Sequence, residues 1–85
     1  MNLKHSLKEK AKIFEPVIRI GKSGLTEDSI KEIKRQLHKK RLIKIKLLKS
    51  CLEKKDRKEF AKDIAEKTDS ELIDQVGFVV VLNKK

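Results

Sequence analysis

The chain has 85 residues, of which 38% are hydrophobic and 42% charged, and it contains only three glycines and one proline. This length and composition exclude a collagen-like, disordered or multidomain protein and predict one compact domain over residues 1–85. The formal net charge of +10 lies entirely in residues 1–49, with 15 basic and 5 acidic side chains, because residues 50–85 have 8 of each. Such an excess predicts an anionic partner: nucleic acid, an anionic membrane surface or an acidic protein.

An amphipathic helix is predicted at the start of the chain, over residues 3–14. Its apolar face is formed by four side chains in a narrow sector of the helical wheel: Leu3, Leu7, Ala11 and Phe14. Lysines at four-residue spacing form the adjoining stripe: Lys4, Lys8 and Lys12. Pro16 ends this helix, and the β-branched run 17–20, which includes Arg19, predicts a short strand.

A second amphipathic helix is predicted after Thr26, a favourable N-cap residue. Glu27 and Asp28 follow in the first turn, where the helix dipole favours acidic side chains. The apolar face has helical spacing: Ile30, Ile33 and Leu37. Basic side chains recur every four residues along one side of the helix: Lys31, Arg35 and Lys39.

Residues 42–48 alternate with a period of two, which predicts a strand with one buried face. The apolar side chains of one face are Ile43, Ile45 and Leu47, and Lys44 and Lys46 point the other way. The two lysines could contact a ligand or form a merely solvated strand face, and the pattern leaves both interpretations open.

The last part of the chain predicts a helix and two strands. Asp56 can cap a third helix that ends near Thr68. Strands are expected at 71–76 and 78–83, hinged at Gly77, and three consecutive valines suit a central strand. The order α-β-α-β-α-β-β predicts a compact α/β fold with a four-stranded mixed sheet packed with helices.

The turn before the second helix has the pattern Gly-x-x-Gly: Gly21, Lys22, Ser23 and Gly24. Two glycines allow a sharp turn and a close approach of a sugar-phosphate backbone to main-chain N–H groups, and the residues between them add a charge and a hydroxyl. The pattern also occurs in ordinary β–α turns, but the basic flanking elements favour nucleic-acid binding. Because Glu27 and Asp28 occupy the positive end of the helix, we expect a phosphate over the loop and not on the helix axis.

Residues 16–26, followed by an amphipathic helix and Leu-Ile-Lys-Ile-Lys at 42–46, resemble the CRM domain. This is the chloroplast RNA splicing and ribosome maturation family, which includes the YhbY proteins. The resemblance covers nearly the whole chain, and its most specific segments are Gly-x-x-Gly-Leu-Thr and Leu-Ile-Lys-Ile-Lys. It implies the same α-β-α-β-α-β-β fold, similar to the C-terminal domain of translation initiation factor three.

The resemblance also implies a stand-alone, non-enzymatic protein that binds structured RNA, with ribosomal RNA in large-subunit precursors as the expected partner. By position, the RNA-contacting loop is the Gly-x-x-Gly turn, and the third helix matches only in pattern, so no binding role is assigned to it. The expected RNA-binding residues are those of the loop and the basic side chains of its flanking elements: Gly21, Lys22, Ser23, Gly24, Lys4, Lys8, Lys12, Arg19, Lys31, Arg35 and Lys39.

Catalytic and metal-binding chemistry is not expected. His5 and His38 have no carboxylate at catalytic spacing, and Cys51, the only cysteine, is interpreted as a small semi-buried residue in a reducing cytoplasm. No cofactor, metal or small-molecule substrate is therefore expected. Without Trp or Tyr, and with three Phe assigned to the core, RNA contacts are expected through phosphate, sugar and shape rather than base stacking.

Other functions remain open at this point. A small basic DNA-binding protein of chromatin type would explain the charge equally well. An adaptor in an assembly complex could pair the apolar segment 78–82 with a partner's strand. Membrane binding is not expected, because that apolar run is far shorter than a span and the first helix lacks Trp. The oligomeric state and the role of the third helix cannot be deduced from the sequence.

Overall fold

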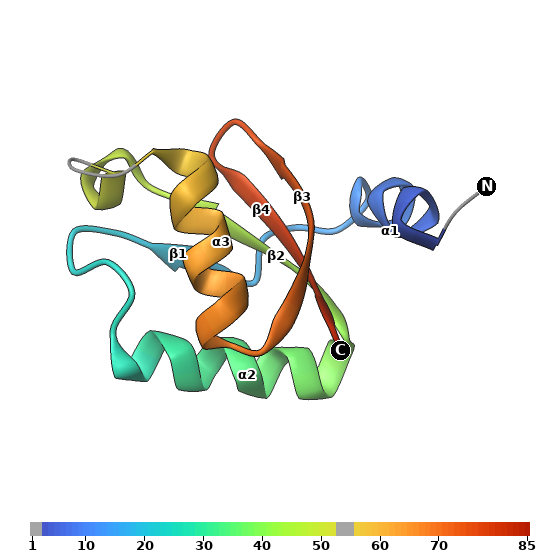
Figure 1. The fold of residues 1–85 in the computed structure, drawn as a ribbon, viewed down its shortest axis with the longest axis horizontal. Helices are drawn as coiled ribbons and strands as arrows, with labels where there is room; N and C mark the ends of the chain where they lie inside the picture. The colour runs from blue at the N-terminus through green and yellow to red at the C-terminus, as the bar shows by residue number, and fades with distance from the viewer. Residues whose placement is uncertain (1–2, 53–55) are drawn as a thin grey trace.

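A computed structural model describes residues 3–52 and 56–85 of the chain, with only the backbone described for residues 3, 4, 51 and 52. The elements follow the predicted order, with a short 3-10 helix in addition (Figure 1). Their bounds are as follows: α1 (Leu3–Ala11), β1 (Ile18–Ile20), α2 (Glu27–Lys40), β2 (Leu42–Leu47), η1 (Lys49–Leu52), α3 (Arg57–Lys67), β3 (Ser70–Val76) and β4 (Val79–Lys84). The α/β fold predicted from the sequence is confirmed.

The four strands form one mixed sheet in the order β1-β2-β4-β3. β1 runs parallel to β2, as expected for strands joined by the crossover helix α2, whereas β4 is antiparallel to both β2 and β3. β4 is thus a central strand, as its valines predict, and both of its edges are hydrogen-bonded. The proposed strand pairing of segment 78–82 with a partner is therefore wrong, because the sheet edges are β1 and β3.

The sheet separates two apolar clusters. Helices α2 and α3 cover one face, where Ile33, Ile45 and Ile64 are fully buried in the larger cluster. α1 packs on the opposite face through Ala11, beside Leu42 and other residues of a smaller cluster. Figure 1 shows α1 well apart from α2 and α3. Because strand side chains alternate between faces, the sequence of β2 alone fixes which residues belong to which layer.

The end of α1 differs from the prediction. The helix stops at Ala11, and the amides of residues 13 and 14 bond to carbonyls three residues back, at 3.4 and 3.1 Å. The reason is Pro16, which disfavours helical backbone at Glu15 and so ends the helix before the next turn can form. Phe14 consequently leaves the apolar face of α1 and is 36% exposed. The assignment of this side chain to the core is wrong.

The other helix ends follow the sequence with one exception. Thr26 caps α2, since its Oγ1 accepts a hydrogen bond from the Ser29 amide at 3.1 Å. Asp56 occupies the N-cap position of α3, but its side chain makes no capping hydrogen bond. None of the helices within residues 3–52 and 56–85 has the length and apolar character needed to cross a membrane.

Candidate nucleic-acid interface

The Gly-x-x-Gly segment forms a β-turn at the end of the edge strand β1. The Gly24 amide donates to the Gly21 carbonyl at 2.9 Å, which places Lys22 and Ser23 at the two central positions of the turn. Both side chains are exposed. The turn therefore presents an ammonium group and a hydroxyl beyond the end of the sheet (Figure 1).

The two glycines of this turn have different structural roles. Gly24 has φ +67°, in the left-handed region that favours glycine, and a Cβ built on it would meet nothing within 4 Å. A Cβ on Gly21 would instead lie 3.3 Å from Cδ1 of Leu48, at the start of the segment leading to η1. Gly21 thus allows Leu48 to approach, whereas Gly24 allows the turn conformation and leaves open space above the loop.

The N-terminus of α2 is occupied by the protein's own side chains. Besides accepting from the Ser29 amide, the Thr26 hydroxyl donates to Ser29 Oγ at 3.1 Å, and Glu27 and Asp28 fill the first turn. Two carboxylates at the positive end of a helix disfavour an anion there. The expectation that a phosphate sits over the loop remains a prediction, and this arrangement favours it.

The predicted basic residues lie on opposite faces of the sheet. Ile18 and Ile20 point towards the larger core, so Arg19 points to the α1 face, where its register partner is Lys46. The α1 lysines lie on this same side, although the side chain of Lys4 is outside the described residues. The basic residues of α2 lie on the other side: Lys31, Arg35 and Lys39. Only the β1 edge and its turn adjoin both groups.

On the α1 face, the two strand lysines differ from each other. Lys44 is half-buried, and its Nζ donates to the carbonyl of Phe14 at 3.1 Å, so it ties the segment after α1 to the sheet. Lys46 is exposed beside Arg19. A hollow of about 310 Å³ next to α1 is lined by Lys8, Lys12 and Lys44 together with Asp74 and valines of β3 and β4. The exposed lysine is therefore the better candidate for a contact.

On the α2 face, one predicted cation is already paired. Arg35 donates two hydrogen bonds to Glu32, Nε to Oε1 at 3.0 Å and NH2 to Oε2 at 2.6 Å. Hydrogen bonds from Arg35 and then Gln36 lower the pKa of the Glu32 carboxyl to about 2, and the same pair raises the pKa of Arg35. Arg35 thus offers less net charge to a ligand than the neighbouring lysines do.

The CRS1 / YhbY (CRM) domain family matches residues 2–84, nearly the entire chain. The chain belongs to the CRM domain family. The resemblance inferred from the Gly-x-x-Gly turn and the β2 sequence is thereby confirmed.

Three proteins similar to this CRM domain are informative. A probable RNA-binding protein of Methanocaldococcus jannaschii is 41% identical over 80 residues, which cover 94% of this chain but only 59% of that protein. The probable RNA-binding protein YqeI of Bacillus subtilis is 32% identical over 96% of this chain and 83% of its own length. The solution structure of a Staphylococcus aureus protein, described as a candidate RNA-binding protein, superposes with a TM-score of 0.81 and 34% identity, covering 96% of this chain and 83% of that one.

Sequence reasoning missed a second cluster of cations in this CRM domain. The antiparallel pairing of β4 with β2 brings Lys84 to the end of α2, where its amide donates to the Arg41 carbonyl at 2.7 Å and its Nζ lies 3.1 Å from His38 Nδ1. A hollow of about 280 Å³ beside it is also lined by Lys34 and by Lys85, which pairs with Asp69 at 3.8 Å. The division into a charged first part and a neutral second part concealed this cluster, because it joins both parts.

No metal centre is indicated by the described part of the CRM domain, in which no three His, Cys, Asp or Glu residues are grouped suitably for an ion. The ionisable side chains described here instead form helix-surface pairs such as Lys12 with Glu9 at 3.1 Å. The chemistry that the surface offers is therefore hydrogen-bond donation and positive charge.

Proposed function

We propose that this CRM domain is a non-enzymatic protein that binds structured RNA through the turn of residues 21–24 and the basic side chains beside β1. The observation that carries the proposal is the exposed Lys22–Ser23 turn at the end of an edge strand, adjoining both basic faces. Membership of the CRM family and the names of its relatives, probable RNA-binding proteins, support it.

The position of β1 explains how one RNA could reach both faces. An edge strand has no neighbouring strand on its outer side, so a ligand lying along it can contact side chains that point up and down from the sheet. Arg19 and Lys46 are available on the α1 face and Lys31 on the α2 face. Contacts of this kind go mainly to phosphates, which fix the position of the RNA and carry little sequence information.

We further propose that the RNA is ribosomal and belongs to precursors of the large subunit in the cytoplasm. The family resemblance of the 16–26 and 42–46 segments supports this narrower assignment. The test is to crosslink the protein in cells and sequence the attached RNA. Large-subunit ribosomal RNA and its precursors should dominate, and a predominance of unrelated transcripts would contradict the assignment.

A competition experiment separates RNA from DNA as the partner. Structured RNA and duplex DNA of equal length are added at one salt concentration, because the affinity for either polyanion depends on salt. Preferential displacement by RNA is expected. Preference for the DNA would favour a chromatin-type function and would contradict the proposed one.

A further inference from the structure

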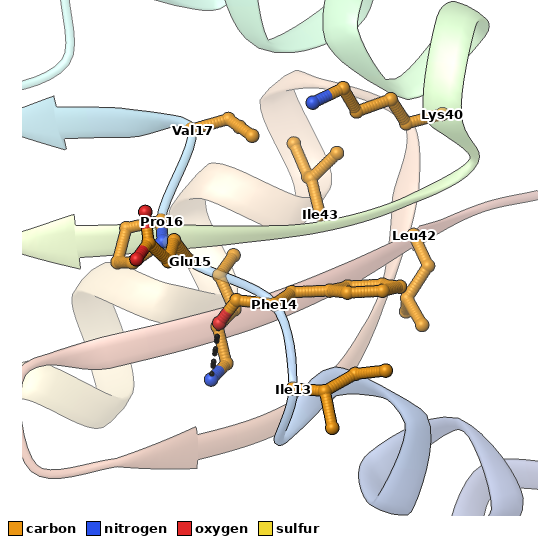
Figure 2. A pocket seen from close by; sticks show the side chains of 9 residues that line it. Ile13, Phe14, Glu15, Pro16, Val17, Lys40, Leu42 and Ile43 are labelled. Carbon is orange, nitrogen blue, oxygen red and sulfur yellow. Dashed lines mark hydrogen bonds between the residues drawn. The ribbon is translucent and has the colours of Figure 1, made fainter.

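A second hollow lies at the start of β1, at the opposite end of that strand from the turn of residues 21–24. It has a volume of about 630 Å³, which is within the usual range of small-ligand sites, and we call it the Phe14 hollow. Figure 2 shows the Phe14 side chain extending towards Leu42, while Lys40 reaches from the end of α2 towards Val17. Apolar side chains thus form most of its wall.

The ring of Phe14 is unusually available. Phe60 is buried in the core, and Phe78 is half-buried and carries the guanidinium of Arg57 5.0 Å from its ring centre. Phe14 is 36% exposed, and the neighbouring Ile13 is 82% exposed. A CRM domain with so few aromatic residues therefore presents one ring at the wall of its hollow.

The segment that presents this ring is fixed to β2. The Lys44 ammonium donates to the Phe14 carbonyl at 3.1 Å, the dashed contact in Figure 2, and the Val17 amide donates to the Lys44 carbonyl at 3.0 Å. These two bonds hold the backbone on both sides of Glu15 and Pro16. The ring is accordingly part of a built wall rather than a free chain end.

Main-chain groups of β2 also face the hollow. β1 pairs with β2 only from Ile18 and Ile45 onward, so no β1 residue pairs with Leu42. The Lys44 carbonyl points to the β1 side, and backbone groups of alternate strand residues point the same way. The N–H and C=O of Leu42 therefore face the hollow and offer one donor and one acceptor.

The charge at the rim favours an anion-bearing ligand. Lys40 and Lys44 line the hollow, against one carboxylate, that of Glu15. A nucleotide has the matching features: flat apolar base faces, a base edge with donors and acceptors, and a phosphate. Stacking of a base on an aromatic side chain contributes about 1–3 kcal/mol.

We propose that the Phe14 hollow receives an unpaired base of the bound RNA, stacked on Phe14, with its phosphate near Lys40. This inference rests on the proposed RNA-binding function and extends it to recognition of a flipped or bulged nucleotide. The hollow and the turn are about 13 Å apart along β1, counted from Val17 to Gly21 at 3.3 Å per residue. A single RNA strand lying along this edge could occupy both.

The test compares two RNA hairpins that differ only in one bulged nucleotide. The wild-type protein should bind the bulged hairpin about tenfold more tightly, the equivalent of about 1.4 kcal/mol. Phe14→Ala should abolish that preference while keeping the affinity for the fully paired hairpin, and Phe14→Leu should show whether the aromatic face is needed. Val76→Ala, a change at an exposed residue of the other edge strand, is the matched control.

The outcomes separate this inference from the function it rests on. Equal wild-type binding to both hairpins, or a preference that survives Phe14→Ala, would overturn the base-binding role and leave the RNA-binding proposal standing. Failure of the wild-type protein to bind either hairpin would overturn both. Circular dichroism of each variant verifies that the fold is intact, as expected for a partly exposed side chain outside the core clusters.

Discussion

Gly24 and Gly77 form a natural pair of positions for testing whether the turn of residues 21–24 contacts RNA. Their φ angles are +67° and +58°, and a Cβ at either would meet nothing within 4 Å. Gly77 lies in the β3–β4 hairpin, separated from β1 by β2. The same substitution should therefore disturb the two backbones equally, but only one of the two side chains would stand on the proposed contact surface.

The expected loss of stability follows from the backbone angle. A left-handed conformation costs an L-residue about 1–2 kcal/mol, and Asn is among the residues that tolerate it best. Losing glycine also reduces the entropy of the unfolded chain, which offsets about 0.4–1 kcal/mol. Gly24→Asn and Gly77→Asn should each lower the free energy of unfolding by about 0.5–1 kcal/mol, or the Tm by roughly 2–8 °C.

The effect on RNA binding should differ between the two variants. The Asn side chain at position 24 would project into the open space beside Lys22 and Ser23, where we propose that a sugar-phosphate backbone lies. Gly24→Asn should weaken binding about tenfold, and Gly77→Asn should leave it unchanged. Fluorescence anisotropy with a labelled RNA hairpin measures the affinity, and thermal unfolding followed by circular dichroism measures the stability. Equal affinities for the two variants would refute the placement of RNA over the loop.

Three further changes test the paired arginine, the strained backbone and the core. Glu32→Gln frees Arg35 and should raise RNA affinity about two- to fivefold. Because the folded pKa of Glu32 is about 2, below the ordinary 4.5, its contribution to stability is present above pH 4.5 and is lost towards pH 2; acid titration of unfolding should show a smaller loss in the variant. Arg41→Gly relieves a φ of +67° and should raise the free energy of unfolding by about 0.5 kcal/mol in urea titrations, whereas a decrease would show that the angle is unstrained. Ile45→Ala removes a fully buried side chain and should cost about 2–5 kcal/mol in the same assay, and a loss below about 1 kcal/mol would contradict the core assignment.

The elements of the fold were predictable because local patterns agree with tertiary packing in this chain. The alternation along β2, the Thr26 cap and the three valines of β4 each specify an element that the sheet then uses. The end of α1 was not predictable from periodicity, because Phe14 fits the helical spacing by coincidence. The conformational restriction by Pro16 acts before that residue and removes it from the helix.

The candidate site was predictable in composition but not in arrangement. The turn with Lys22 and Ser23 exposed agrees with the pattern of the sequence. The separation of the basic residues of α1 and α2 onto opposite faces depends on strand order, which the charge distribution does not contain. Likewise, the contact of Gly21 with Leu48 and the approach of Lys84 to His38 join residues distant in the chain. Such contacts become visible only once the sheet is assembled.

The salt dependence of RNA binding tests the central claim most directly, namely that phosphates are bound at the turn and the β1 edge. Neutralisation of about six phosphates predicts a slope of about −4 to −5 for log affinity against log salt concentration. Lys22→Ala should reduce the size of that slope by about 1, whereas Lys58→Ala, at an exposed position on α3, should leave it unchanged. A salt-insensitive affinity, or an equal change for both variants, would contradict the account.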